Sequence, residues 1–235
     1  MQDFGAAFGE AFVLIGSGDA GLSAIVLLSV QVTLTAVILA CAIGLPLGAL
    51  LAVGRFPGRM AMVVVVNALM GLPPVVVGLL AYLMLSSAGP LGPLQLLYTP
   101  TAMIIAQIIL VTPIVAALSC QVIEDLHEEY DEQFRAMGVS TSRAVPTLLW
   151  DARYSLTTVA LAGLGRAIAE VGAVIIVGGN INHVTRVMTT TIALETSKGN
   201  LSLALALGIV LISMSVFVNG AVMVLRSSAR RQAYA

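Results

Sequence analysis

One polar segment interrupts a chain that is otherwise largely apolar, and it limits how the chain can fold. Seven of the twelve Asp and Glu residues fall between Glu124 and Asp151. Charges at this density cannot lie in the hydrocarbon of a bilayer, so the segment Glu124–Tyr154 is predicted to lie in water between membrane spans. Its apolar residues still recur at helical spacing, namely at Leu126, Tyr130, Phe134 and Met137. Steps of four, four and three place them on one helix face that needs a cover, for which a partner protein is one candidate.

The composition around this segment is typical of a protein that crosses a bilayer several times. Of the 235 residues, 59% are hydrophobic and 10% are charged, and the mean hydropathy is +1.02. A soluble domain of this size carries far more charge, so an all-α bundle of transmembrane helices in the lipid bilayer is predicted. A net charge of −1 without a long basic run gives no indication of nucleic-acid binding. Cys41 and Cys120 lie in apolar runs and are interpreted as reduced packing residues.

About five spans are predicted from the apolar runs. Their ranges are about 22–53, 60–86, 101–121, 156–177 and 201–225. Gly44 and Pro46 predict a kink in the first span. The second span contains Gly71-Leu-Pro-Pro74 near its middle, where a Pro-Pro pair frees carbonyls that only protein or a water-lined cavity can satisfy.

The domain organisation follows from these spans. Residues 1–20 are predicted to be an N-terminal interfacial segment with a short helix over about 5–15. Residues 21–226 form one transmembrane domain with the cytoplasmic loop 124–154, and residues 227–235 form a cytoplasmic tail. Within 178–200, a short helix over about 187–194 is expected to dip toward the membrane.

The basic residues predict the orientation. With five spans, the loop at Arg55 and Arg59, the polar segment and the tail share one side. That side holds eight of the eleven Lys and Arg residues, while Arg186 and Lys198 lie on the other. The N-terminus is therefore predicted to face outward and the C-terminus to be cytoplasmic. A sixth span over residues 4–15 would be too short to cross.

Within the polar segment, a glycine separates two helical runs. Gly138 can adopt positive φ, and Ser140 or Thr141 can cap the run that ends near Trp150. The spacing of Glu132 and Gly138 resembles the Glu-Ala-Ala…Gly coupling loop of ABC-transporter permeases of the type I importer class. Gln133 and Phe134 stand in place of the two alanines, and Trp150-Asp151 stands where that motif ends in Leu-Pro. The resemblance implies docking into a groove of a separate ATPase, through Glu132, Phe134, Arg135, Gly138 and Ser140. An ordinary solvated loop is the alternative.

Further segments extend the resemblance over about residues 22–225. The run Gly71–Gly78 looks like the signature of molybdate- and tungstate-type permeases, and Arg166–Asn180 is similar to the corresponding span. Arg186–Gly199 looks more like the tungstate branch, whereas spacing alone does not separate tungstate from molybdate. The resemblance implies the type I importer permease fold, a bacterial inner-membrane location and no enzymatic activity in this chain. It also implies two ATPase subunits that use ATP and Mg²⁺, and an extracytoplasmic substrate-binding protein.

The translocation path or gate is assigned to residues near the middle of the spans. Arg166 and Glu170 are four apart on one predicted helix face, where ionisable residues are functional candidates. A mutual ion pair without a gating role is equally compatible with this spacing. The path assignment also includes Pro73 and Pro74, and Thr189 and Thr190 from a set with Thr185 and Thr191. Their neutral donors suit an oxyanion that must be released, although threonines that only solvate a loop fit as well.

These observations predict the permease subunit of an ATP-driven importer for an oxyanion, with tungstate favoured. Five helices are few to enclose a path, so a homodimer is expected. Small residues of the fourth span could form its close contact, namely Ala160, Ala162, Gly163, Gly165, Ala167, Ala169 and Gly172. The chain has no phosphate loop and no motif for a bound cofactor or metal. The alternatives are a permease for molybdate, sulfate or phosphate, an ion-coupled secondary transporter with Glu170 as ion site, and an intramembrane enzyme.

Overall fold

The computed structural model describes residues 4–139 and 141–233, and these residues form helices and loops without a strand. In chain order, the helices are α1 Phe4–Ser17, α2 Ala20–Val53, α3 Arg59–Met70, α4 Pro74–Leu85, the 3-10 helix η1 Gly92–Leu94, α5 Pro100–Ala136, α6 Thr141–Asp151, α7 Arg153–Ile168, α8 Gly172–Gly178, α9 Met188–Lys198 and α10 Leu201–Ala233. The prediction of an all-α chain is confirmed.

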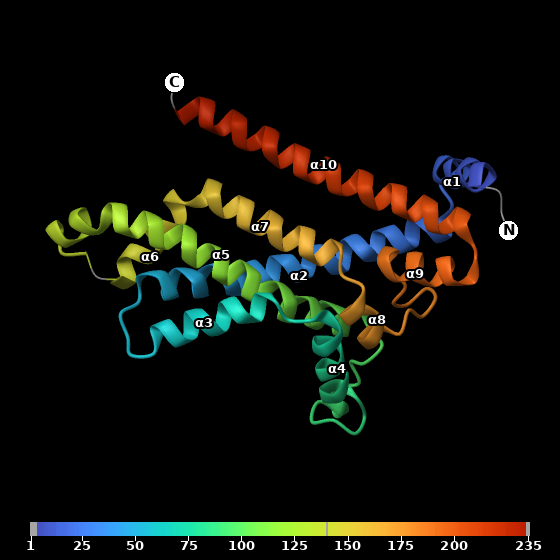
Figure 1. The fold of residues 1–235 in the computed structure, drawn as a ribbon, viewed down its shortest axis with the longest axis horizontal. Coiled ribbons are helices and arrows are strands. Elements are labelled where there is room, and N and C mark those ends of the chain that lie inside the picture. Colours follow the sequence, from blue (N-terminus) through green and yellow to red (C-terminus); the bar gives the residue numbers. More distant parts are fainter. Residues whose placement is uncertain (1–3, 140, 234–235) are drawn as a thin grey trace.

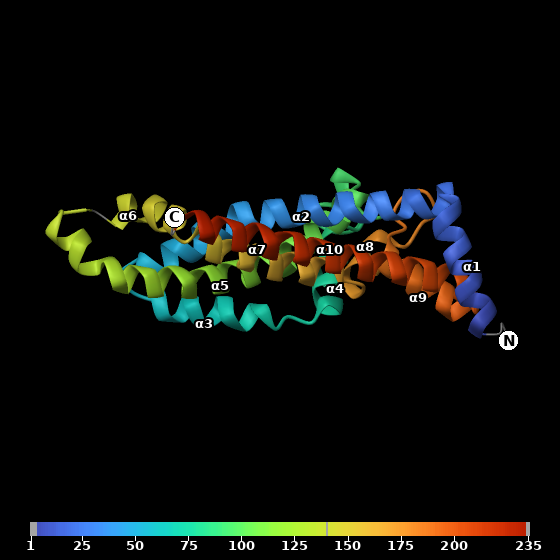
Figure 2. The same ribbon diagram turned by 90° about the horizontal axis from the view of Figure 1, so that it is seen from above.

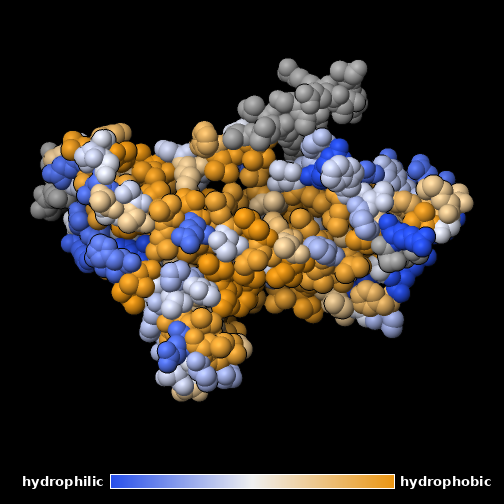
Figure 3. All heavy atoms as spheres, turned by 180° about the vertical axis from the view of Figure 1, so that it is seen from behind, coloured by the Kyte–Doolittle hydropathy of each residue, from blue (hydrophilic) through white to orange (hydrophobic). Residues whose placement is uncertain are grey.

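The bundle is elongated, with α2, α5 and α7 along its long axis (Figures 1 and 2). One end carries α6 and the loop between α2 and α3, and we refer to it as the α6 end. The opposite end carries α1 and α9, and we refer to it as the α9 end. Figure 3 shows a broad apolar surface between more polar ends, as expected for a membrane-spanning protein.

Among the described residues, three helices are long and apolar enough to cross a membrane, namely α2, α5 and α10. Two further pairs, α3 with α4 and α7 with α8, pass the same criterion only together. They are bent by 100° and 57°. Counting each bent pair as one span gives up to five spans, in agreement with the predicted number. The second and fourth predicted spans are therefore each divided into two helices.

The 100° bend follows from the local sequence. Gly71 ends α3, and Pro73 and Pro74, which have no N–H to donate, precede and begin α4. The carbonyl of Pro73 accepts hydrogen bonds from Val76 and Val77, at 3.0 and 3.3 Å. This carbonyl is therefore satisfied within the protein, and α4 turns away from the bundle axis (Figure 1).

α2 and α5 form the tightest helix contact of the bundle. A Cβ atom at Gly48 would overlap Ser119 Oγ and the Ala116 carbonyl, and one at Gly44 would lie 2.9 Å from Val115. The Ser119 hydroxyl also donates to the Gly44 carbonyl at 3.3 Å. α2 remains helical through Gly44 and Pro46. These glycines thus allow two long helices to approach closely, as small residues four apart do in membranes.

The N-terminal segment forms the expected short helix, α1, which lies across the α9 end of the bundle (Figure 2). Ala11 packs in a cluster with Leu22, Ala206 and Leu207. The Ser202 hydroxyl donates to Glu10 Oε2 at 2.5 Å. These contacts hold α1 against the start of α10, so one side of α1 is packed within the protein.

Candidate coupling surface and polar pocket

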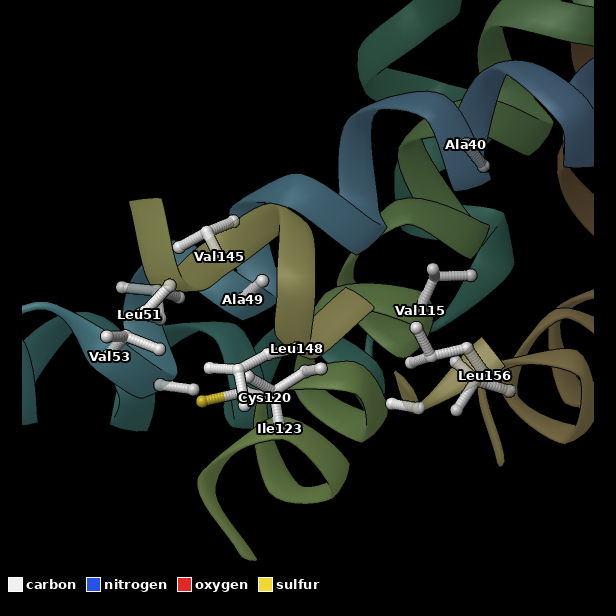
Figure 4. Close-up of a cluster of buried hydrophobic side chains, with 14 of the residues drawn as sticks. Ala40, Ala49, Leu51, Val53, Val115, Cys120, Ile123, Val145, Leu148 and Leu156 are labelled. Carbon is white, nitrogen blue, oxygen red and sulfur yellow. The ribbon is translucent and has the colours of Figure 1, made fainter. Parts of the chain in front are cut away.

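At the α6 end, α6 folds back onto the ends of α2 and α5. Leu148 of α6 is fully buried beside Cys120 and Ile123 of α5, and Val145 lies near Leu51 of α2 (Figure 4). A buried leucine of this kind stabilises a fold by about 2–5 kcal/mol relative to alanine. The end of the molecule is therefore a packed unit rather than a loose loop.

This packing changes the interpretation of the apolar helix face in the polar segment. Leu126, Tyr130 and Phe134 pack against the protein's own core at the α6 end, and Phe134 stacks edge-on with Tyr130. Only Met137 of the four remains open, with 65% of its surface exposed. The expectation that this face needs an external cover is wrong for the first three residues, because they already pack within the chain's own core. The segment is also not a separate helix, since α5 continues without a break to Ala136.

The tip of α5 carries the residues assigned to ATPase coupling. Glu132 and Gly138 are exposed, and Gly138 has a φ of +64° with open space where a Cβ atom would lie. Arg135 pairs with Asp131 at 2.6 Å. Phe134 points inward and holds the tip to its own core. Ser140 lies outside the described residues. The tip therefore leaves Glu132, Arg135, Met137 and Gly138 exposed.

A clamp that the sequence did not indicate ties this end together. Arg59, at the start of α3, pairs with Glu124 of α5 at 2.7 Å. The Arg59 guanidinium also donates to the carbonyls of Leu51 and Ala52, at 2.6 and 3.3 Å. These are among the last carbonyls of α2, which lack helical donors, so one arginine joins three helices. The partners are too far apart in sequence for spacing to reveal them.

At the bend between α7 and α8, Arg166 and Glu170 form an ion pair of 2.6 Å. α7 ends at Ile168, so Glu170 lies in the break rather than on the same helix face as predicted. Its Oε1 accepts a hydrogen bond from the Ala173 N–H at 3.0 Å, in the first turn of α8. Glu170 is 3% exposed. The carboxylate thus joins the last turn of one helix to the first turn of the next.

A small polar pocket lies beside this break, with a cavity volume of about 20 Å³. Its polar walls come from α2, α5, the break and α9, namely Ser29, Thr33, Gln107, Glu170 and Thr189. Gln107 is 4% exposed. Its amide donates to the Ala167 carbonyl at 3.3 Å, while its Oε1 has no partner among the described residues. An unpaired buried acceptor is costly, so this atom faces a site for a donor.

Sequence reasoning did not single out Ser29, Thr33 or Gln107. A signal for Gln107 exists, because it is an isolated amide within the apolar run of the third span. Nothing in the sequence distinguishes Ser29 and Thr33 from other hydroxyl residues in spans, where such side chains commonly bond to their own helix.

Of the threonines near α9, Thr185, Thr190 and Thr191 are buried and Thr189 is half-buried, so they do not merely solvate a loop. The Thr189 hydroxyl donates to the Glu170 carbonyl at 2.9 Å, which connects α9 to the break. Thr190 is fully buried and bonds to Asn180 Oδ1 at 3.0 Å, and Thr185 bonds to the Gly178 carbonyl at 2.5 Å. Of these threonines, only Thr189 lines the polar pocket. Thr190 holds the loop before α9.

The two bends lie against each other. A Cβ atom at Gly172 would lie 3.1 Å from Val75 and 3.5 Å from Pro74 Cβ, and one at Gly78 would lie 2.8 Å from the Ala173 Cα. α4 and α8 therefore pack closely from their first turns (Figure 1). Pro73 and Pro74 thus lie next to the start of α8, close to the break that holds Glu170. They do not line the polar pocket.

The family described as the inner membrane component of binding-protein-dependent transport systems matches residues 44–231. The tungstate uptake system permease protein TupB of Peptoclostridium acidaminophilum is 38% identical over 222 residues, which cover 94% of this chain and 97% of that protein.

Two further relatives are named for anions. A probable anion ABC transporter permease protein of Haloferax volcanii is 40% identical over 211 residues, covering 86% of this chain and 90% of that protein. The sulfate transport system permease protein CysW of Synechocystis is 28% identical over 210 residues, covering 85% and 75%, respectively.

Proposed function

Because the chain belongs to the family of inner membrane components of binding-protein-dependent transport systems, we propose that it forms the translocation path of an ATP-driven importer for tungstate. The family membership carries this proposal, together with 38% identity over nearly full length to a tungstate uptake permease. A transport system of this family includes an ATPase and a substrate-binding protein. The chain itself is a permease rather than an enzyme. ATP and Mg²⁺ are used by the ATPase, and this chain binds no cofactor.

The α6 end is the surface for the ATPase in this proposal. It carries the exposed Glu132, Met137 and Gly138 on a tip that its own core and the Arg59–Glu124 pair hold rigid. A rigid tip can transmit a displacement to the helices behind it, since packed cores shift as units. The α6 end accordingly lies in the cytoplasm. The excess of basic residues on this side of the membrane supports this placement. The N-terminus and α9 then face outward.

A homodimer completes the path. The small residues of the fourth predicted span divide into two sets, since Gly163 and Ala167 of α7 and Gly172 of α8 are occupied by contacts or burial within the protomer. Ala162, Gly165 and Ala169 remain exposed on the outer side of α7. Residues four and three apart share a helix face, so this exposed stripe allows close approach of a second copy in a membrane.

Uptake by reconstituted vesicles tests the function. The chain, its ATPase and its binding protein are expected to accumulate tungstate only with internal ATP, and to retain uptake when ion gradients are collapsed. Uptake that follows an ion gradient without ATP would instead support a secondary transporter. Competition against uptake of labelled tungstate by unlabelled tungstate, molybdate and sulfate separates the oxyanions. The cognate substrate is the one that suppresses this uptake at the lowest concentration.

The coupling role is tested by Glu132→Ala, with Asp125→Ala as a matched control. Asp125 is exposed on the same helix about 10 Å further from the tip. Glu132→Ala is expected to reduce both co-purification of the ATPase and ATP-driven uptake, while Asp125→Ala leaves both near normal. Equal effects of the two substitutions would assign the loss to general charge rather than to docking at the tip.

A further inference from the structure

A second pocket, at the α9 end, has no role in the path described above. It lies between the first turns of α2 and the loop before α9, with a cavity volume of about 310 Å³. Its polar walls are Asp19, Asn182, His183 and Arg186, and its apolar walls include Leu22, Ile25, Leu28 and Leu203. Small-ligand sites in proteins have this size and this combination of apolar walls with few polar groups.

Arg186 is the main charged group of this pocket. Among the described residues it forms no ion pair, and its Nε is buried without a hydrogen-bond partner. The nearby Glu195 is engaged elsewhere, by Lys198 at 2.9 Å and Asn200 at 3.0 Å. The hydrogen bond from Lys198 lowers the pKa of the Glu195 carboxyl, with a smaller contribution from the charge of Arg186. A partly buried guanidinium with a free donor suits an oxyanion, which accepts such bonds.

The loop that carries Arg186 is held in a fixed shape. The Thr185 hydroxyl accepts from the Ile181 N–H at 2.9 Å and donates to the Gly178 carbonyl, and Asn180 is bonded to Thr190. Asn180 and His183 adopt φ values of +50° and +60°. Non-glycine residues take this conformation where the surroundings impose it. The loop therefore holds Asn182, His183 and Arg186 together at the pocket in a fixed conformation. It does not have to become ordered before an anion binds.

The pocket adjoins the polar pocket at the helix break. On α2, Leu28 lines the pocket at the α9 end and the next residue, Ser29, lines the polar pocket. On the loop side, Arg186 lines the pocket at the α9 end and Val187 lines the polar pocket. The Ser29 hydroxyl accepts a hydrogen bond from the Met188 N–H at 2.7 Å, at the boundary of the two. An anion held at Arg186 would therefore stand next to the region assigned to the path.

We infer that this pocket is an entry site for a small tetrahedral oxyanion, in which Arg186 attracts the anion and Asp19 limits its residence. The inference rests on the proposed function for its direction of transport. Asp19 lines the same pocket, and its Oδ1 accepts from the Leu22 N–H at 2.8 Å, at the start of α2. A site for transit must attract an ion and also release it, so opposed charges in one pocket suit entry better than storage.

Site-directed labelling tests the inference without relying on transport. Asn182→Cys places a thiol at the pocket in a chain whose Cys41 and Cys120 are replaced by alanine. The complete importer in nanodiscs is treated with a negatively charged and a neutral methanethiosulfonate reagent of similar size. The ratio of the two rates is expected to fall about threefold with Arg186→Gln and to rise by a similar factor with Asp19→Asn. Asparagine still caps a helix, so the second change preserves α2.

Protection and controls identify the anion. Sodium tungstate is expected to slow labelling of Asn182→Cys more than equal ionic strength of sodium chloride, and Arg186→Gln should abolish this protection. Leu94→Cys, exposed beyond α4, should show no dependence on Arg186. Protection that requires anionic lipid and not tungstate would make the pocket a headgroup site and overturn the inference. A labelling ratio indifferent to both substitutions, in a background that retains ATP-driven uptake, would refute the entry site and leave the proposed function intact.

Discussion

Removing one partner of the Arg166–Glu170 pair is expected to have a markedly unequal effect on stability. The Glu170 side chain is 2% exposed and that of Arg166 is 30% exposed. Arg166→Gln leaves a buried carboxylate without its counter-charge, which costs about 3–5 kcal/mol. Glu170→Gln leaves a guanidinium that is partly exposed rather than buried, and the new amide oxygen can still accept from Ala173, so the cost is about 1 kcal/mol, as for one lost hydrogen bond.

These values translate into separate melting temperatures. At about 2–4 °C per kcal/mol for a chain of this length, Arg166→Gln should lower Tm by about 6–20 °C and Glu170→Gln by about 2–4 °C. The assay is the monodisperse fraction of the purified complex in size-exclusion chromatography after heating. The double Gln variant should recover most of the loss of Arg166→Gln, because it contains no buried charge.

The reverse order of the two single variants would refute this reasoning, as would equal losses. Exchanging the two residues is a less useful test, because an arginine at position 170 cannot accept the hydrogen bond from Ala173 that Glu170 accepts at 3.0 Å. Uptake by the double Gln variant separates the remaining alternatives. Near-normal uptake would mean that the pair is structural only, and loss of uptake in a stable protein would support a gating role.

Three further substitutions test packing and backbone geometry. Gly48→Val must separate α2 from α5, since a Cβ there would overlap Ser119 Oγ. The free energy of unfolding should fall by about 1–3 kcal/mol or more, which should reduce the yield of monodisperse protein. A normal yield would contradict this close contact. Leu148→Ala should cost about 2–5 kcal/mol, measured as a lower Tm of the ATPase-bound complex, and an unchanged Tm would mean that α6 is not packed as described. Gly138→Ala should strain the backbone by about 1–2 kcal/mol, because Gly138 has a φ of +64°, and this strain should weaken ATPase binding. Gly138→Asn should bind the ATPase with an affinity closer to that of the wild type. Equal affinities of the two variants would contradict a backbone cause.

Local sequence predicted the features that arise from composition and from patterns close together in the chain. The membrane-spanning helices, their approximate number and the glycine at the tip of α5 follow from hydropathy and residue type. The family followed from the spacing of Glu132 and Gly138 with the segments around Gly71 and Arg166. The prolines also marked the place where the second span bends, although a 100° turn depends on α8 packing against α4.

Other features depend on contacts between distant residues and leave no local pattern. Leu126 looked like part of an uncovered face, because helical spacing alone does not reveal that it packs against the core cluster at the α6 end. The Arg59–Glu124 clamp joins residues with no sequence relation between them. Arg166 and Glu170 have helical spacing whether or not the helix ends between them, so spacing alone could not reveal the break in which Glu170 lies.

The role of the α6 end as the ATPase surface is tested most directly by cross-linking. Met137→Cys, in a chain without Cys41 and Cys120, places a thiol at the exposed tip. In the assembled importer, this thiol should cross-link to the ATPase with a short bifunctional reagent, and the yield should change on addition of ATP. Leu94→Cys should give no such product. A cross-link from Leu94→Cys but not from Met137→Cys would place the ATPase elsewhere and contradict the proposed coupling.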